Sequence, residues 1–318
     1  MKPASPPLPH DMISTQPSYY LMQLKKDNYK SFYLSFLRVA VSIFLLAQVF
    51  INWSYLDMLY GNSGFIEFKV NFLNRLPGGV GFVREHYIKF IAVYTGVLML
   101  NILGIGRWIT AFVLYLMVYI LQQMNTVFIN GGDVMARLIL FYLVFADSYQ
   151  YFVVFPQKPV SPGKKSVQNL LSNLAALSIM LQLCLAYFSS GIAKAMDPMW
   201  QRGEATYYAM QLERFIGTPL NHYIVEHKWA NYFSNYATVA VELVFPILVW
   251  FKKLRPFILT SGFILHLSIY IFLMIYGFQL VFLLIYGLFL PNAFWVKFAK
   301  RLRLIGNRDG TLTADQLQ

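Results

Sequence analysis

Lys194 is the side chain in this 318-residue sequence that is best placed for acid–base chemistry. It comes at the end of a long apolar run, just after the small residues 189–191, which we expect to turn the backbone tightly. Asp197 and Pro198 follow and should end any helix, because proline lacks a backbone donor and restricts the residue before it. A lysine that is partly removed from water loses its proton more easily than a free one. We therefore predict that Lys194 is a base at a membrane surface, the alternative being an interfacial charge on a snorkelling side chain.

Five ionisable residues lie inside apolar runs: Arg38, Arg137, Asp147, Glu242 and His266. A charge in the centre of a bilayer costs about 2.5–3.5 kcal/mol or more, so each should face the interior of a helix bundle and find a partner. Asp133 and Arg137 are four residues apart and can pair along one helix face. We predict that Glu242 and His266 face each other and act as acid–base partners of Lys194, because a carboxylate and an imidazole can share a proton. The alternative for all of these residues is a structural role between helices.

Four further residues are predicted to contact a substrate: Trp200, Tyr207, Tyr208 and Arg38. Trp200 is expected to anchor its segment at the membrane interface and to cover the amine of Lys194. Either tyrosine could hold a polar head group. We predict no metal site, because the histidines do not have the spacing of metal ligands and the single cysteine, Cys184, lies in an apolar run.

The composition indicates a membrane protein. Apolar residues make up 58% of the chain and charged residues 13%, against roughly 45–50% and about 25% in soluble domains. The fold class predicted is therefore all-α, a polytopic bundle of transmembrane helices. The net charge of +12 does not indicate nucleic acid, because the basic residues gather beside the apolar runs.

About eight spans are expected. Their predicted ranges are 32–53, 87–103, 108–124, 134–155, 170–189, 232–251, 257–276 and 278–290. Most approach the ~20 residues that a bilayer requires, and the last is short and is expected to tilt or break at Pro291. The chain then divides into a cytosolic N-terminal segment at 1–30, disordered at its start, a transmembrane domain at 31–291 and a basic cytosolic tail at 292–318.

The distribution of lysine and arginine predicts that both termini are cytosolic. With this orientation the inner segments contain twice as many of these residues as the outer ones. Lys194 and its loop then face the outside. The basic tail should contact anionic lipid, at about 1 kcal/mol per charge near the surface. The predicted localisation is a multi-pass protein of the bacterial cytoplasmic membrane.

Several sequence elements, taken in order, resemble the HTTM (horizontally transferred transmembrane) domain family, which includes the membrane domain of vitamin K-dependent gamma-carboxylases. The elements are Tyr60-Gly-Asn-Ser-Gly64, Asn130-Gly-Gly-Asp133 with Arg137, Gly191-Ile-Ala-Lys194, Asp197-Pro-Met-Trp200-Gln-Arg-Gly203-Glu-Ala-Thr-Tyr-Tyr208, Glu242 with Pro246, and His266 with Phe278. The resemblance covers residues 31–291. The ordered set is more specific than the Gly-x-x-Lys…Trp-x-x-Gly element alone.

The resemblance implies an activity for Lys194. In the carboxylases, the matching lysine is the base that deprotonates reduced vitamin K, and the quinol then reacts with oxygen and drives carboxylation of a glutamate. This chain has Ala193 where those enzymes have a second lysine, and it lacks their large lumenal domain. Short bacterial members of the family are similar to it, and some of them are needed to mature a secreted peptide toxin of the sporulation-delaying type.

Two functions of different classes follow from these observations. The first is a carboxylase- or epoxidase-like membrane enzyme, in which Lys194 acts on a reduced quinone or another lipid-soluble substrate. The second is a non-catalytic membrane factor for the maturation or export of a secreted peptide. In both cases the partners expected are the lipid bilayer and, in the second, a peptide, with no role for nucleic acid.

Overall fold

The computed structural model describes residues 17–62, 79–156, 160–275 and 277–304. Residues 1–16 of the predicted N-terminal cytosolic segment, residues 305–318 of the predicted C-terminal tail and residues 63–78 of the first outer loop lie outside these ranges. Within them all regular structure is helical, as the composition predicts, and no strand occurs.

The helices of the first half follow the predicted spans closely. The N-terminal helix precedes them, and three short helices follow the first span. In order the elements are α1 (Pro17–Lys26), α2 (Ser31–Ile51), η1 (Trp53–Tyr55), α3 (Leu56–Tyr60), α4 (Gly79–Glu85), α5 (Tyr87–Leu103), α6 (Trp108–Met124) and α7 (Gly131–Phe145). The bounds of α5 and α6 equal the predicted ones. Gly104, with a φ of +72°, ends α5 because glycine adopts this left-handed conformation without strain.

The second half begins with the longest helix. Its elements are α8 (Pro162–Met196), α9 (Pro198–Gln201), α10 (Ala205–Ala209), η3 (Glu213–Phe215), α11 (Leu220–Glu226), α12 (Lys228–Leu248), α13 (Arg255–Leu273), α14 (Phe278–Tyr286), η4 (Gly287–Phe289) and α15 (Asn292–Arg301). Pro162 occupies the first turn of α8, where its missing N–H is not needed.

Three of the described helices, α2, α8 and α13, are long and apolar enough to cross a membrane. The segment 278–289 and α15 would form a fourth span if they are one unit, although they meet at an angle of 110°. The helices α5 and α6 are apolar but only 17 residues long. By length and composition, the described part of the chain therefore has three or four candidate spans rather than the eight expected.

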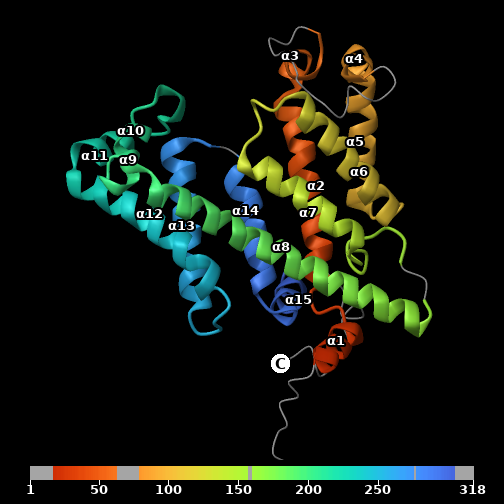
Figure 1. The fold of residues 1–318 in the computed structure, drawn as a ribbon. Coiled ribbons are helices and arrows are strands. Elements are labelled where there is room, and N and C mark those ends of the chain that lie inside the picture. Colours follow the sequence, from red (N-terminus) through yellow and green to blue (C-terminus); the bar gives the residue numbers. More distant parts are fainter. Residues whose placement is uncertain (1–16, 63–78, 157–159, 276, 305–318) are drawn as a thin grey trace, which may run out of the picture.

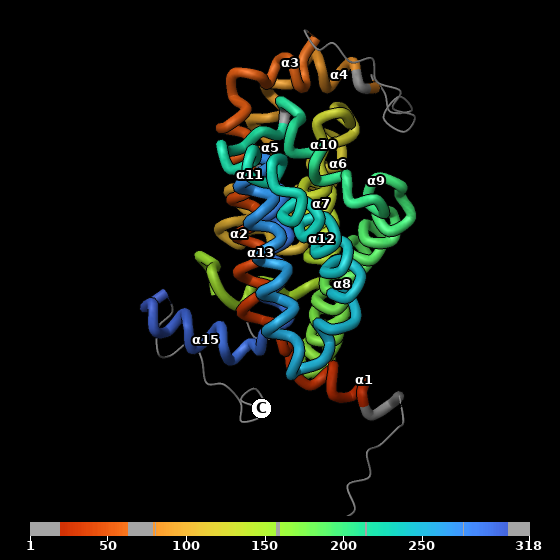
Figure 2. The backbone as a smooth tube through the Cα atoms, turned by 90° about the vertical axis from the view of Figure 1, so that its left-hand side faces the viewer, coloured from red at the N-terminus to blue at the C-terminus, as the bar shows by residue number. Residues whose placement is uncertain are grey.

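The helices run between two ends of the molecule. At one end lie α1 and α15, and at the opposite end lie α3 and α4 (Figures 1 and 2). The short helices α9, α10 and α11 form a separate group beside the end of α8 (Figure 1). The outward faces of the long helices carry exposed apolar side chains such as Ile43, Leu185 and Phe263, as expected for surfaces that contact lipid.

Arg38 explains why the fourth predicted span ends early, at Phe145 instead of residue 155. The chain leaves the helical conformation at Ala146, and the carbonyl groups of Ser148, Tyr151 and Phe152 accept hydrogen bonds from the Arg38 guanidinium. Irregular backbone at membrane depth persists only where the protein satisfies its polar groups.

Candidate active site at the interface of α8 and α12

The continuous helix α8 carries Lys194 in its last turn. The prediction of a turn at residues 189–191 is wrong, because all three residues are helical. Gly191 instead allows close packing, since a Cβ added there would lie 2.9 Å from Cδ2 of Leu243 on α12. Small residues let two helix backbones approach in this way, and the approach places Lys194 beside the α12 residue Glu242.

Lys194 and Glu242 form an ion pair between the two helices. The amine Nζ donates to both carboxylate oxygens, at 2.8 Å to Oε1 and 2.7 Å to Oε2, and to the hydroxyl Oγ of Ser190 at 2.5 Å. The side chain of Lys194 is 22% exposed and that of Glu242 is 9% exposed. The pair is thus largely sheltered from water, and one edge of the lysine remains accessible from outside the bundle.

Trp200 covers this pair from one side. The Lys194 Nζ lies 5.3 Å from the centroid of the Trp200 ring, within the range of a cation–π contact. The position of the ring is held at two points. The carboxylate of Asp197 accepts the N–H of Met199 and of Trp200 as the N-cap of α9, and the amide of Asn235 donates to the Trp200 carbonyl at 2.8 Å. Asp197 and Pro198 therefore end α8, as predicted, and they also begin α9, which was not predicted.

His266 belongs to a second, fully buried array. Its Nε2 lies 2.7 Å from the hydroxyl of Tyr187 on α8, and that hydroxyl lies 2.5 Å from the hydroxyl of Tyr286 on α14. The other ring nitrogen of His266, Nδ1, has no hydrogen-bond partner among the described residues. Gly262, one turn before His266 on α13, makes room for the array, since a Cβ added there would lie 2.1 Å from the Tyr286 hydroxyl.

The two groups are neighbours along α8. Tyr187 and Lys194 are seven residues apart, which places them on one face of the helix about 10 Å from each other along its axis. Phe245, one turn from Glu242 on α12, stacks on the Tyr187 ring with the centroids 4.4 Å apart. Glu242 and His266 both point into the bundle, but no hydrogen bond between them occurs in the described residues. Glu242 binds the lysine and His266 binds the tyrosines.

Arg38 and the two tyrosines of α10 do not join this group. Arg38 is completely buried, and its five N–H groups donate to the carbonyls of Asn101, Ile102, Ser148, Tyr151 and Phe152. A guanidinium has five donors, so none is left for a substrate, and the predicted role in substrate binding is replaced by a structural one. Tyr207 and Tyr208 are exposed and contact each other, with ring centroids 5.3 Å apart.

Asp133 and Arg137 do not pair. The carboxylate of Asp133 accepts the N–H of Asn130 in a capping box at the start of α7, and the guanidinium of Arg137 lies 5.5 Å from the centroid of the Tyr119 ring. Asp147, by contrast, is buried and forms an ion pair with Lys165 at 3.2 Å. No cluster of three metal-ligating side chains occurs in the part of the chain that the structure describes.

Sequence reasoning missed the polar stripe on α12 that holds the α8–α10 segment. Asn231 donates to the Gly203 carbonyl at 2.7 Å, and Asn235 donates to that of Trp200. Together with Thr238 and Glu242, these residues recur at helical spacing in an otherwise apolar helix. This periodicity could have revealed the stripe from the sequence. No sequence signal indicated the roles of Tyr187 and Tyr286, because a tyrosine in an apolar run is usually a packing residue.

Comparisons of the chain with protein-family models, with curated proteins and with solved structures find no match. The function is therefore argued from the geometry of the site and from the sequence resemblance described above.

Proposed function

We propose that this protein is an HTTM-like membrane enzyme that removes a proton from a quinol or a similar lipid-soluble substrate at the extracytoplasmic face. The observation that carries the proposal is the ion pair of Lys194 and Glu242, which is mostly buried yet open along one edge of the lysine. A purely structural ion pair needs no such opening. The neighbouring Tyr187–His266–Tyr286 array supplies groups that can exchange protons within the same helix interface.

The membrane arrangement that fits this proposal has eight spans and cytosolic termini. The eight helices α2, α5, α6, α7, α8, α12, α13 and α14 would cross the membrane in turn, the shorter ones with help from flanking residues. The excess of lysine and arginine in the inner segments favours the end with α1 and α15 as the cytosolic one. A bacterial cytoplasmic membrane is the location that follows from the resemblance.

In the proposed reaction Lys194 first passes a proton to Glu242, with which it already shares two hydrogen bonds. The neutral amine then accepts a proton from a substrate hydroxyl within about 2.6–3.2 Å, leaving an oxyanion on the substrate and an ammonium on Lys194. Trp200, in cation–π contact with the amine, covers one side of it, so the substrate would approach the amine from the side that remains exposed. Ser190 orients the amine through its hydroxyl oxygen.

The proposal is tested with the purified protein in lipid nanodiscs, a reduced naphthoquinone and oxygen, by measuring oxygen uptake and the quinone products by mass spectrometry. Lys194→Arg keeps the charge and can still bind Glu242, but a guanidinium does not lose its proton. We expect turnover to fall by about 10²-fold or more, as for loss of a general base. Ser189→Ala is the matched control, because the Ser189 hydroxyl donates only to the Ala186 carbonyl in its own helix. Full turnover in Lys194→Arg would rule out the base.

The second function proposed is a non-catalytic factor that holds a secreted peptide. It is favoured by the exposed aromatic side chains on α10, α11 and the start of α12, which are Tyr207, Tyr208, Tyr223, Trp229 and Phe233. Exposed aromatic groups at one end of a membrane protein suit either the lipid interface or a bound peptide. Mass spectrometry of peptides that co-purify with the protein distinguishes the two functions, since a retained peptide with no quinol turnover supports the second.

A further inference from the structure

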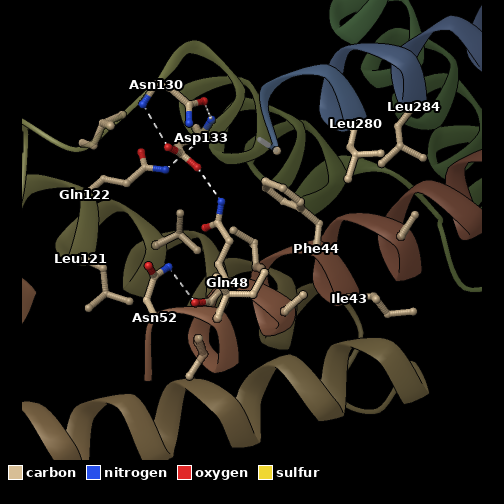
Figure 3. Close-up of a pocket in the computed structure, with 18 of the residues that line it drawn as sticks. Ile43, Phe44, Gln48, Asn52, Leu121, Gln122, Asn130, Asp133, Leu280 and Leu284 are labelled. Atoms are coloured by element: carbon tan, nitrogen blue, oxygen red, sulfur yellow. Dashed lines mark hydrogen bonds between the residues drawn. The ribbon is translucent and has the colours of Figure 1, made fainter. Parts of the chain in front are cut away.

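A cavity of about 1090 Å³ runs along α2, away from Lys194 and Glu242. Its walls come mainly from α2, with residues of α3, α5, α6, α7, α13, α14 and α15, and it extends from Tyr33 and Trp295 to Asn52. Apolar side chains form most of the wall, including Ile43, Leu280 and Leu284 (Figure 3). Ile43 is also 51% exposed on the outside of α2, so this wall borders the surface that would meet lipid.

One end of the cavity is polar and carries a negative charge. Asp133 lies there between Gln48 of α2 and Asn130 (Figure 3). Its Oδ1 accepts from the Gln48 amide at 2.8 Å, and its Oδ2 accepts from the Asn130 N–H at 3.0 Å. A carboxylate can accept about four hydrogen bonds, so two positions remain on Asp133.

Two further acceptors belong to residues of the same wall, Gln122 of α6 and Asn125, the residue that follows α6. Their amide groups donate to backbone carbonyls, those of Asp133 at 2.8 Å and of Leu59 at 3.2 Å. Because a carbonyl can only accept, these bonds fix which end of each amide is nitrogen. The remaining atoms, Gln122 Oε1 and Asn125 Oδ1, are therefore acceptors, and neither has a partner among the described residues although both side chains are at least nine-tenths buried.

No cation among the described residues balances this end. The residues that line the cavity include no lysine, arginine or histidine, and Asp133 has no cationic partner in the described part of the chain. Tyr60 also lines the cavity, and burial, followed by the nearby Asp133 carboxylate, raises its pKa to about 12. Tyr60 is therefore a neutral hydroxyl over the physiological range. The polar end presents one negative charge and an excess of acceptors.

We propose that this cavity binds an amphiphile with a primary ammonium head group and at least one hydrocarbon chain. An ammonium group has three donors and one positive charge, which match the carboxylate of Asp133 and the two unpaired amide oxygens after small side-chain shifts. The hydrocarbon chain lies along α2 between Ile43 and Leu280. From Gln48 back to Tyr33, α2 extends about 22 Å, which is long enough for an extended lipid chain.

The proposal does not depend on the chemistry at Lys194, because neither Lys194 nor Glu242 lines the cavity. Binding is measured by titrating hexadecylamine into the full-length protein in nanodiscs of phosphatidylcholine. Hexadecanol and hexadecyltrimethylammonium are the comparison probes, since the first has no charge and the second has no donor. We expect the amine to bind at least about tenfold more tightly than either probe.

Two variants test the two parts of the site. Asp133→Asn should remove the preference for the amine. Ala47→Trp should fill the cavity and weaken the binding of all three probes, because Ala47 lines the cavity. Asp197→Asn is the matched control, a carboxylate that also caps a helix but lies outside the cavity. Lys194→Arg should bind the amine like the parent, whatever its turnover.

The source of the ammonium group is identified by native mass spectrometry after reconstitution with phosphatidylethanolamine. Retention of this lipid by the parent, and its loss in Asp133→Asn, assigns the site to a lipid head group. Binding of hexadecylamine without retention of the lipid assigns it to a free long-chain amine. Equal binding of the amine and hexadecanol, or an unchanged preference in Asp133→Asn, would overturn the proposal.

Discussion

The interface of α8 and α12 and the cavity along α2 each contain a sheltered carboxylate, and the two carboxylates are stabilised differently. Glu242 is neutralised by Lys194, and Gly191 brings the two helices close enough for both oxygens to be used. Asp133 accepts hydrogen bonds from the Gln48 amide and the Asn130 N–H and lies at the start of a helix, but it has no cationic partner among the described residues. In the first site the protein itself neutralises the carboxylate. The second site retains acceptors that have no hydrogen-bond partner among the described residues, and such acceptors can bind a ligand that has donors.

Removing one partner of the ion pair should have the largest effect on stability. Glu242→Leu leaves the ammonium of Lys194 mostly buried, with the Ser190 hydroxyl and the Trp200 ring as its remaining contacts but no counter-charge, which should cost about 3 kcal/mol in the free energy of unfolding. The double variant Lys194→Met with Glu242→Leu should recover much of this loss. The measurement is unfolding in mixed micelles by titration with a denaturing detergent. The exposed pair of Arg202 and Glu204 is the control, and its removal should change stability by less than about 1 kcal/mol.

Disturbing the buried array of Tyr187, His266 and Tyr286 should have a smaller effect on stability. Gly262→Ala places a methyl group against the Tyr286 hydroxyl, and overpacking of this kind costs about 2 kcal/mol. The hydrogen bond between Tyr187 and Tyr286 should lengthen, and turnover should fall if the array moves protons. Gly96→Ala is the matched control, because an added Cβ there meets nothing within 4 Å. Equal stability of the two variants would show that α13 and α14 are further apart than the structure places them.

Asp133→Asn should lower the free energy of unfolding by less than Glu242→Leu or Gly262→Ala does. The asparagine can still accept the N–H of Asn130, so the loss in the free energy of unfolding should be about 1 kcal/mol, typical of a weakened cap. This small loss, set beside a large loss of amine preference, would separate a binding role of Asp133 from a structural one. A loss as large as that of Glu242→Leu would indicate that Asp133 has a stabilising partner in the protein.

The smallest effect is expected for the exposed tyrosines. Tyr207→Ser and Tyr208→Ser should change the free energy of unfolding by no more than about 0.5 kcal/mol, because both rings are exposed and contact mainly each other. Turnover of a quinol should be unchanged if the substrate contacts the exposed side of Lys194 and does not reach α10. A fall in turnover with unchanged stability would restore them as substrate contacts, and a loss of a co-purifying peptide would favour the second function.

The sequence by itself determined the helical class, the bounds of α5 and α6 and the residues most worth testing. Long apolar runs can only be helices in a bilayer, and glycine after Leu103 ends α5. Lys194, Glu242 and His266 could be identified because an ionisable group in such a run is costly and therefore must be sheltered. The break after α8 at Asp197 and Pro198 also followed from backbone geometry alone.

Only the tertiary structure decided which groups meet. Periodicity shows which face of a helix turns inward but not which helix lies opposite. The sequence therefore grouped Glu242 and His266 with Lys194, but it could not show that Glu242 binds the lysine directly while His266 binds Tyr187. The helical state of residues 189–191 was also decided by packing, since helix propensities differ by at most about 1 kcal/mol for these residues and contact with α12 outweighs them. The same contact, made possible by the missing side chain of Gly191, brings the lysine to its carboxylate.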